Sequence, residues 1–366
     1  MGTGIVSLLL VAIPYHARWL YWTSVFFFCL NVILFTATFA ISLFRYAAYP
    51  DIFHVMLADR TNSLFLGTIP MGFATLIEAW VFLCVPYWGH WAITFAWVCW
   101  MIDSVVAISV TIFLTILLIS SPYQQGLDRI TAAQLLPISA TTVAAGTGAE
   151  ISRVLPNQEK ALVTLIICYV MWGMSVPLAM SVLVMYYQRL ALHKLPPREV
   201  IVSSFLPLSP LGMGGYTIMY LGSVAHTVFP QTQFFEILPM AGEVVHIMGI
   251  FIALVMWGFG LTWLCFALAT IYKSRPFPFN MGWWGFTFPL GVFTISTIEF
   301  GHQMPSRFFK VLGTVFSVAV ILLWCVVTIG TIRGVIDGRL FEAPCLVNLP
   351  KKDDDLHDTD NESAPR

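Results

Sequence analysis

The stretch Phe288-Pro289-Leu290-Gly291 belongs to a set of four similar stretches in which a proline inside an apolar segment is followed by a small residue. The other three are Ile69-Pro70-Met71-Gly72, Leu136-Pro137-Ile138-Ser139 and Ser209-Pro210-Leu211-Gly212. The four prolines are separated by 67, 73 and 79 residues, and each interval has the length of one helical hairpin. A repeat of this period predicts tandem helical hairpins, and five of them fit the chain.

The composition excludes a water-soluble globular protein. Of the 366 residues, 58% are hydrophobic and only 10% are charged, whereas soluble domains carry about 25% charged residues. Apolar runs of 18 or more residues recur along the chain, as expected of helices that satisfy their backbone hydrogen bonds inside a lipid bilayer. The formal net charge of -1 gives no reason to expect a nucleic-acid partner.

The apolar runs predict an all-α integral membrane protein with ten transmembrane spans. We place the spans at residues 1–15, 20–44, 62–84, 92–119, 132–153, 160–188, 200–228, 239–272, 280–302 and 307–335. With the N-terminus in the cytosol, thirteen of the 18 lysine and arginine residues fall on the cytosolic side, as the positive-inside rule requires. Residues 1–340 are therefore the predicted transmembrane domain, both termini are predicted to be cytosolic, and residues 341–366 are expected to form a disordered polar tail.

Odd-numbered and even-numbered spans differ in composition. Even-numbered spans, for example residues 22–43 and 311–332, are almost purely apolar and predict unbroken helices that face lipid. The four proline breaks fall in odd-numbered spans, and Met1-Gly2-Thr3-Gly4 looks like the second half of such a span, so we expect the sequence to begin part-way into its first helix. Breaks in register predict that the odd spans surround a shared water-filled cavity. The alternative is that proline and glycine only permit close helix packing.

A break in a membrane helix offers a site for an anion. Proline removes one amide donor, and the half-helix that follows presents free N–H groups and the positive end of its dipole. The predicted pore-lining breaks comprise Gly2, Thr3, Gly4, Pro70, Gly72, Pro137, Ser139, Pro207, Pro210, Gly212, Gly214, Pro289 and Gly291. Hydroxyl groups close to these breaks are candidate anion ligands, namely Thr68, Thr141, Thr142, Ser209 and Thr287.

Ionisable side chains inside the spans are further candidates, because charge is costly in a bilayer. Glu78 and Asp103 lie in the third and fourth spans, where they are predicted either to couple protons to transport or to form structural hydrogen bonds. A third group falls near the predicted extracellular ends of spans and consists of Glu150, Arg153, His226, Glu243, His246, Glu299 and His302. This group predicts an outer vestibule that senses pH through its histidines, or side chains that only contact interfacial water.

An enzyme hypothesis also follows from the sequence. Residues 243–246 and 299–302 both read Glu-x-x-His, which is the spacing found in di-iron sites of helical bundles, and Glu78 and Glu150 are the candidates for the remaining ligands. Glu78 is predicted deeper in the membrane than the two pairs, however, and Glu150 stands near Arg153. The sequence has no phosphate-binding Gly-x-x-x-x-Gly-Lys motif. We therefore predict a transport protein rather than an enzyme, with no cofactor and no metal site.

Three stretches resemble one known family. They are Met1-Gly2-Thr3-Gly4, the run from Phe205 to Gly215, and Phe279-Asn280-Met281-Gly282-Trp283-Trp284-Gly285-Phe286-Thr287-Phe288-Pro289-Leu290-Gly291. They resemble the tellurite-resistance/dicarboxylate transporter family, which has a slow-anion-channel-like fold, and within it they look most like the fungal sulfite efflux pumps. The resemblance covers nearly the whole chain through residue 335.

The resemblance implies five helical hairpins in a quasi-fivefold arrangement, with odd helices lining a central pore and even helices outside. It also implies a plasma-membrane location, a homotrimer, and an aromatic gate that matches Phe288, with Phe286 as a second candidate. Sulfite is the implied substrate, and malate is the alternative. Because the odd spans contain no lysine or arginine away from their ends, a small inorganic anion is favoured over a dicarboxylate.

Overall fold

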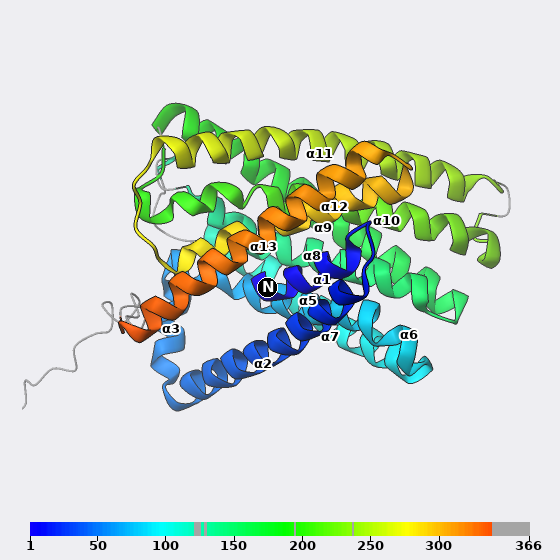
Figure 1. The fold of residues 1–366 in the computed structure, drawn as a ribbon, viewed down its shortest axis with the longest axis horizontal. Coiled ribbons are helices and arrows are strands. Elements are labelled where there is room, and N and C mark those ends of the chain that lie inside the picture. The colour runs from blue at the N-terminus through cyan, green and yellow to red at the C-terminus, as the bar shows by residue number, and fades with distance from the viewer. Residues whose placement is uncertain (121–125, 128–129, 194, 236–237, 339–366) are drawn as a thin grey trace, which may run out of the picture.

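The computed structural model describes residues 1–120, 126–127, 130–193, 195–235 and 238–338. Within these ranges the chain is helical and forms no β-strand (Figure 1). The all-α class predicted from the sequence is therefore confirmed for the described part of the chain. The polar tail predicted for residues 341–366 lies outside it.

Five helices are mostly buried within the molecule, and we call them the inner helices. They are α1 (Gly2–Ala12), α5 (Thr68–Leu83), α8 (Leu135–Val154), α10 (Leu208–Thr232) and α12 (Thr287–Gln303). Eighteen of the 20 residues of α8 and fourteen of the 17 residues of α12 are buried. Glycine, alanine, serine and threonine make up more than half of α8, and such small side chains allow neighbouring helix backbones to approach closely.

Five longer helices surround them, and we call these the outer helices. They are α2 (Arg18–Ala48), α7 (His90–Ile119), α9 (Gln158–His193), α11 (Ala241–Lys273) and α13 (Arg307–Ile336). Only three of the 31 residues of α2 and four of the 30 residues of α13 are buried. The exposed surface of these helices consists largely of leucine, isoleucine, valine and phenylalanine side chains. An apolar surface of this extent fits lipid rather than water.

Six segments of the described chain are long and apolar enough to cross a membrane. They are the five outer helices and the segment Leu64–Leu83, which contains α5. The other inner helices are shorter, or they are richer in small and polar residues. The protein is thus an all-helical, multi-pass membrane protein.

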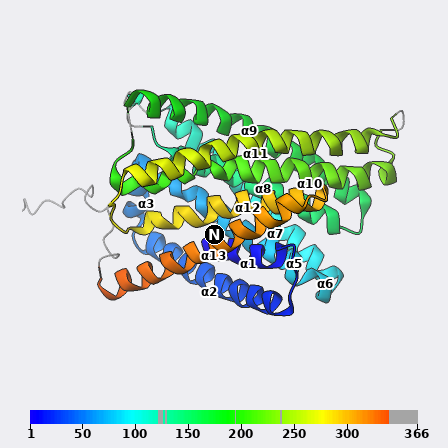
Figure 2. The same cartoon turned by 45° about the horizontal axis from the view of Figure 1, so that its top comes forward.

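Each inner helix packs against the next outer helix in the chain, so that α1 contacts α2, α5 contacts α7, α8 contacts α9, α10 contacts α11 and α12 contacts α13. The inner helices also contact one another in a closed series, α1 with α5, α5 with α8, α8 with α10, α10 with α12, and α12 with α1. In Figures 1 and 2, α2 and α11 lie on opposite sides of the molecule, with α1, α8 and α12 between them.

A 3₁₀ segment precedes four of the inner helices. These segments are η1 (Leu64–Gly67), η3 (Ala132–Gln134), η4 (Arg198–Phe205) and η5 (Met281–Phe286). The prolines of the four repeated stretches each occupy the third residue of the α-helix that follows, at positions 70, 137, 210 and 289. The prediction that these prolines break continuous α-helices is therefore wrong. They lie in first turns, where the amide that proline lacks has no partner within the helix.

The junctions between 3₁₀ segments and α-helices are neighbours in space. η1 contacts η3, η3 contacts η4, and η4 contacts η5. A Cβ atom on Gly67, the last residue of η1, would lie only 2.7 Å from the Cα of Pro137 at the start of α8. A Cβ atom on Gly2 would lie 2.5 Å from Thr287 Oγ1, so α1 begins beside the start of α12. The four junctions and the start of α1 thus form one connected region.

One outer helix contains an internal proline and still shows the continuity predicted for the even-numbered spans. Pro177 lies inside α9, which nevertheless continues from Gln158 to His193. The Ser181 hydroxyl donates a hydrogen bond to the Pro177 carbonyl at 3.1 Å. Three shorter helices, α3 (Pro50–Ala58), α4 (Arg60–Ser63) and α6 (Val85–Trp88), lie in the connections between the long ones.

Candidate functional site

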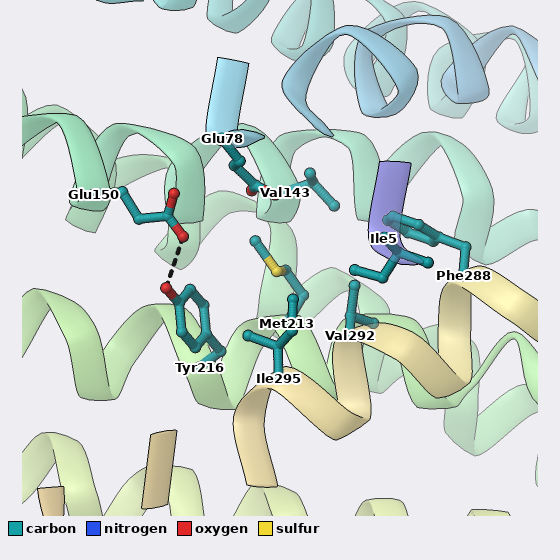
Figure 3. A pocket seen from close by; sticks show the side chains of 9 residues that line it. All are labelled: Ile5, Glu78, Val143, Glu150, Met213, Tyr216, Phe288, Val292 and Ile295. Carbon is teal, nitrogen blue, oxygen red and sulfur yellow. Dashed lines mark hydrogen bonds between the residues drawn. The ribbon is translucent and has the colours of Figure 1, made fainter. Parts of the chain in front are cut away.

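All five inner helices contribute side chains to one cavity between them. The cavity is narrow, with a water-accessible volume of about 10 Å³, and it is lined by Ile5, Glu78, Val143, Glu150, Met213, Tyr216, Phe288, Val292 and Ile295. Figure 3 shows these side chains converging from different helices. Six of the nine are apolar, so the three polar side chains determine which hydrogen bonds the wall offers to a ligand.

Two glutamates and a tyrosine form the polar part of the cavity wall (Figure 3). Glu78 of α5 is buried, and its Oε1 accepts a hydrogen bond from Thr147 Oγ1 at 2.8 Å. Glu150 of α8 is also buried, and its Oε1 accepts a hydrogen bond from the Tyr216 hydroxyl at 2.6 Å. Glu150 Oε2 has no hydrogen-bond partner. Neither carboxyl forms an ion pair with a described residue, so an anion in the cavity would meet acidic groups that no fixed cation balances.

Phe288 is part of the apolar wall of the same cavity. It is buried near the start of α12, and it lines the cavity together with Ile5 of α1 (Figure 3). Val292 follows one turn later on α12 and also lines the cavity. Gly291 contacts the Ile5 side chain, and its lack of a Cβ atom allows α1 and α12 to approach closely here. The structure thus places the predicted gate residue in the cavity wall.

Phe286, the second candidate for the gate, is absent from the cavity wall. Its ring packs edge-on against Phe205 at a centroid distance of 4.9 Å and against Trp283 at 5.6 Å. The Trp283 indole donates a hydrogen bond to the Pro278 carbonyl at 3.0 Å. These contacts hold Phe286 in the packing between η4 and η5.

None of the residues predicted at the helix breaks lines this cavity. The glycines among them lie where helices approach closely. A Cβ atom on Gly212 would lie 2.7 Å from the Phe293 Cα, and one on Gly214 would lie 2.6 Å from the Met256 side chain. The others are buried or half-buried within the first turns of the inner helices or close to them, namely Gly2, Thr3, Gly4, Pro70, Gly72, Pro137, Ser139, Pro207, Pro210, Pro289 and Gly291.

Four of the five hydroxyl groups predicted as anion ligands, those of Thr68, Thr141, Thr142 and Thr287, form hydrogen bonds within the protein. Thr141 Oγ1 lies 2.7 Å from Thr111 Oγ1 of α7, and Thr142 Oγ1 donates to Ser175 Oγ of α9 at 2.9 Å. These two threonines therefore connect α8 to outer helices. The remaining three lie in first turns of inner helices, and they are Thr68, Ser209 and Thr287.

Asp103 is a buried carboxyl on an outer helix, α7. It does not line the cavity, but it interacts electrostatically with Glu78, which does. Its Oδ2 atom has no hydrogen-bond partner. Asp103 therefore reaches the cavity only through Glu78.

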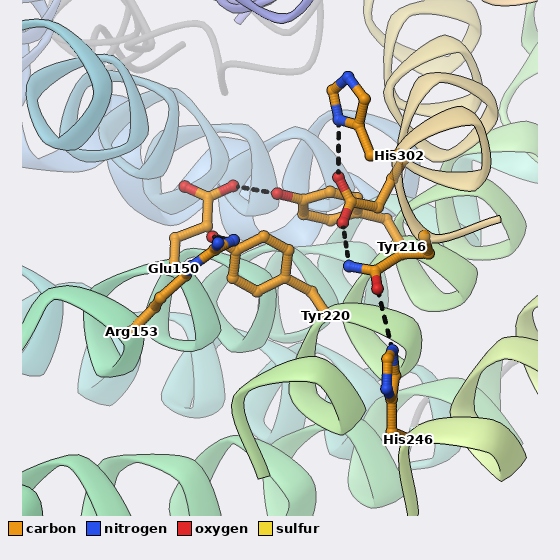
Figure 4. A network of polar contacts seen from close by, with 8 residues as sticks. Glu150, Arg153, Tyr216, Tyr220, His246 and His302 are labelled. Atoms are coloured by element: carbon orange, nitrogen blue, oxygen red, sulfur yellow. Dashed lines mark hydrogen bonds and ion pairs between the residues drawn. The ribbon is translucent and has the colours of Figure 1, made fainter. Parts of the chain in front are cut away.

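A second polar group joins α10, α11 and α12, and we call it the rim network (Figure 4). His302 Nδ1 lies 3.6 Å from Glu299 Oε2, and Gln303 Nε2 donates to Glu299 Oε1 at 2.6 Å. Gln303 Oε1 lies 2.9 Å from His246 Nε2, and the His246 ring lies 5.7 Å from the His226 ring. The structure thus brings together Glu299 and the three histidines that the sequence grouped in a vestibule.

Arg153 and two tyrosines, Tyr216 and Tyr220, belong to the same polar region as Glu150 and the rim network (Figure 4). The rings of Tyr216 and Tyr220 are 5.4 Å apart. Arg153 Nη1 donates to the Tyr220 hydroxyl at 3.3 Å, and the guanidinium lies 5.6 Å from the Tyr220 ring centroid. Arg153 is therefore directed at Tyr220 and not at Glu150. Glu243 is exposed in the first turn of α11 and takes no part in these contacts.

Four residues of these contacts, Thr147, Tyr216, Tyr220 and Gln303, were not predicted from the sequence. Tyr216 and Tyr220 are four residues apart in a segment of small and apolar residues, so they share one face of α10. A buried tyrosine hydroxyl needs a hydrogen-bond partner, and this requirement was a signal that could have connected α10 to a carboxyl group.

The di-iron hypothesis has no set of ligands in the described residues. Glu299 and His302 pair with each other, whereas His246 bonds to Gln303. The described part of the chain contains no group of three or more histidine, cysteine, aspartate or glutamate residues that could hold a metal ion.

Sequence comparison identifies the family to which this bundle and its cavity belong. The profile of the family described as SLAC1, voltage-dependent anion channel, matches residues 1–332. The chain belongs to this family. The resemblance to a family with a slow-anion-channel-like fold, based on residues 1–4, 205–215 and 279–291, is thereby confirmed. Membership of this family supports a transporter or channel rather than an enzyme.

Relatives of known name differ in their similarity to the chain. The sulfite efflux pump SSU1 of Arthroderma benhamiae is 50% identical over 341 residues, which cover 93% of this chain and 90% of that protein. The sulfite efflux pump SSU1 of Candida albicans is 29% identical over 360 residues, covering 92% and 72%. The malic acid transport protein of Schizosaccharomyces pombe is 24% identical over 368 residues, covering 98% and 80%. Both sulfite efflux pumps are thus more similar to this chain than the malic acid transport protein is.

Proposed function

We propose that this protein exports sulfite from the cytosol through the cavity between its inner helices. The observation that carries the proposal is that all five inner helices line this one cavity. The choice of sulfite is supported by 50% identity to a sulfite efflux pump over nearly the whole chain.

In this proposal the ten long helices form five hairpins in a quasi-fivefold arrangement around the transport path. The closed series of contacts among the inner helices supports this arrangement. The recurrence of a 3₁₀ segment before four of the five inner helices supports it as well. The inner helices then line the path, and the outer helices separate it from lipid.

Phe288 acts as the gate. An apolar constriction excludes water and ions when it is narrow, and Phe288, Ile5 and Val292 provide such a wall. Rotation of the Phe288 ring away from Ile5 would widen the path without breaking a hydrogen bond.

The starts of the inner helices attract the anion towards the cavity. The dipoles of these helices favour negative charge at their starts, and Thr68, Ser209 and Thr287 lie in these first turns. Thr141 and Thr142 can bind an anion only after leaving their partners on α7 and α9.

Malate is the second candidate substrate. A dicarboxylate carries two carboxylates that a lysine or arginine would normally neutralise. The cavity wall contains neither residue, and this composition favours a small anion with fewer charged groups.

We further propose that the protein lies in the plasma membrane with both termini in the cytosol, and that it forms a homotrimer. The distribution of lysine and arginine, thirteen of 18 on the cytosolic side, supports the orientation. The rim network then faces the outside of the cell.

Flux measurements in proteoliposomes test the proposal directly. Purified protein is reconstituted, and uptake of radiolabelled sulfite and of radiolabelled malate is compared with that of protein-free liposomes. We expect sulfite uptake to exceed malate uptake clearly. Equal uptake of both anions would remove the substrate assignment, and uptake of neither would remove the proposed function.

A further inference from the structure

Glu150 has a carboxyl oxygen without a partner at the wall of the cavity. The side chain is only 3% exposed, and its Oε1 is held by the Tyr216 hydroxyl. Oε2 has no hydrogen-bond partner. Most buried polar atoms are hydrogen-bonded, and an exception inside a cavity points to a ligand that the protein alone does not supply.

The surroundings of Glu150 do not favour an ionised carboxylate. Glu78 interacts with it electrostatically, and neither group has an ion-pair partner among the described residues. Arg153, the nearby cation on the same helix, is bonded to Tyr220 instead. Burying a carboxylate without a cation is strongly unfavourable, so such a group takes up a proton.

A protonated carboxyl group has one hydrogen-bond donor and retains an acceptor. At Glu150 the Tyr216 hydroxyl already donates to Oε1, so Oε1 serves as the acceptor. The proton therefore belongs on Oε2, which is left free to donate. Neutral carboxylic acids act as donors to developing anions in other proteins when their site is apolar.

We propose that Glu150 binds the permeating oxyanion as a neutral carboxylic acid that donates its hydrogen bond from Oε2. The inference rests on the proposed passage of sulfite through this cavity, and it adds the residue that recognises the anion there. A hydrogen bond to an ionised acceptor is stronger than one between neutral groups. The acid keeps its proton as the anion passes, so no proton is transferred. When the carboxyl ionises it loses the donor and repels the anion, so flux depends on its protonation.

Several other titratable groups lie around Glu150, and they must be held constant in any test of this dependence. Glu78 and Glu299 interact with it electrostatically, as does Tyr216. On the helices packed against α8, these groups include Glu78 of α5, Asp103 of α7, Cys168 of α9, and Tyr216 and Tyr220 of α10. Arg153 lies on α8 itself and donates to Tyr220, and Glu299 lies on α12. Since all of them are present in both the wild type and a Glu150 variant, the ratio of the two fluxes isolates the contribution of Glu150.

The test uses radiolabelled sulfite flux in proteoliposomes that hold the full chain, with the same pH on both sides, from pH 5.5 to pH 7.5. The variants are Glu150→Gln, which keeps a neutral donor, Glu150→Leu, which has none, and Tyr216→Phe, which releases Oε1. Glu159→Gln is the control, because this exposed residue in the first turn of α9 loses the same charge away from the cavity. Each flux is divided by the wild-type flux at the same pH, which cancels the protonation of sulfite itself.

We expect Glu150→Leu to lower the flux about tenfold at pH 5.5, the effect of losing one hydrogen bond to a charged group. Glu150→Gln should lower it about threefold, because an amide is a weaker donor than a carboxylic acid. Its ratio to wild type should rise with pH, since only the wild type can ionise at this position. The ratio for Glu159→Gln should stay at one throughout.

Two results would overturn the inference while leaving sulfite export intact. One is a Glu150→Leu flux within a factor of about two of wild type. The other is a Glu150→Gln ratio that stays flat or falls with pH. A wild type that does not carry sulfite would instead remove the proposed function. If Glu150→Leu fails to fold, the near-isosteric Glu150→Gln ratio alone decides, with Tyr216→Phe expected to lower flux about threefold.

Discussion

α8 and α2 belong to the same molecule but have opposite surroundings. Eighteen of the 20 residues of α8 are buried, against three of the 31 residues of α2. α2 is among the described segments that are apolar enough to cross a membrane, and α8 is not. The helix that lies deeper in the protein is thus the less apolar one, which reverses the order found in water-soluble proteins.

The difference teaches that inner and outer helices are held together by close packing and hydrogen bonds. Lipid tails are as apolar as leucine, so apolar side chains gain little by leaving lipid for the protein interior. α8 offers small residues instead, and a Cβ atom on Gly148 would lie 2.5 Å from the Trp100 ring of α7. The Trp100 indole also donates to the Ala144 carbonyl at 2.8 Å. Substitutions on inner helices should therefore have much larger effects than matched ones on outer helices.

The largest effect is expected for an added side chain between two inner helices. In Gly212→Ala the new Cβ atom would lie 2.7 Å from both the Cα and the N of Phe293. These are backbone atoms, so α10 and α12 must separate, and we expect a loss of about 3 kcal/mol in the free energy of unfolding. The midpoint of thermal unfolding in detergent, followed by tryptophan fluorescence, measures it.

Gly173→Ala is the matched control on the outer helix α9, where a Cβ atom would meet nothing within 4 Å. We expect a change of less than about 1 kcal/mol, in the stabilising direction, because alanine favours the helix. Equal destabilisation by the two variants would contradict the contrast between inner and outer helices.

The second effect concerns transport. Phe288→Ala removes a ring from the apolar wall of the cavity, and a wider constriction stays hydrated. We expect sulfite flux in proteoliposomes to increase on the order of tenfold, with a smaller gain for Phe288→Leu.

Phe286→Ala is the control for this effect, since that ring packs against Phe205 and Trp283 outside the cavity wall. It should lower the unfolding midpoint without raising flux per folded molecule. An unchanged flux in Phe288→Ala would contradict the assignment of Phe288 as the gate. A gain in flux from Phe286→Ala would contradict the assignment of Phe286 to packing.

Much of the fold was predictable from sequence because lipid leaves few alternatives to a helix. Apolar runs located the outer helices, and the spacing of prolines located the inner ones. The position of proline in its helix was not predictable, because the same Phe-Pro-Leu-Gly stretch suits either a mid-helix break or a first turn. The 3₁₀ segments before Pro70 and Pro289 decide between the two, and they depend on contacts between the junctions.

The site was less predictable than the fold. Glu78 and Glu150 were singled out by type, since charge is rare in or near membrane spans, whereas Phe288 was singled out by the family resemblance, which implies an aromatic gate at this position. Which of them face the cavity depends on the rotation of each helix about its axis, and a helix buried on all sides has no apolar stripe to reveal it. Tyr216 was missed for this reason. In addition, its partner Glu150 lies 66 residues away in the sequence, so no local pattern connects the two.

A third prediction concerns the contact between α7 and α8. Thr111 donates to the Pro137 carbonyl at 2.6 Å and lies 2.7 Å from Thr141 Oγ1. Thr111→Val keeps the shape but removes both bonds, and we expect a loss of about 1 kcal/mol, the usual value between membrane helices. Thr115→Val is the control, because that hydroxyl donates only within α7, to the Thr111 carbonyl. Thermal unfolding of both variants checks the prediction, and it fails if Thr115→Val costs as much.

The smallest effect is expected at the rim network. Gln303 joins α12 to α11 there, because its Nε2 donates to Glu299 Oε1 at 2.6 Å and its Oε1 lies 2.9 Å from His246 Nε2. Gln303→Leu removes both contacts, and we expect a loss of about 0.5 kcal/mol in the free energy of unfolding, followed by thermal unfolding in detergent. His193→Gln, an exposed position in the last turn of α9, should leave the unfolding midpoint unchanged. A midpoint for Gln303→Leu equal to that of the wild type would show that the rim network adds nothing to the packing between α11 and α12, and the inner helices would then be specialised only at the cavity.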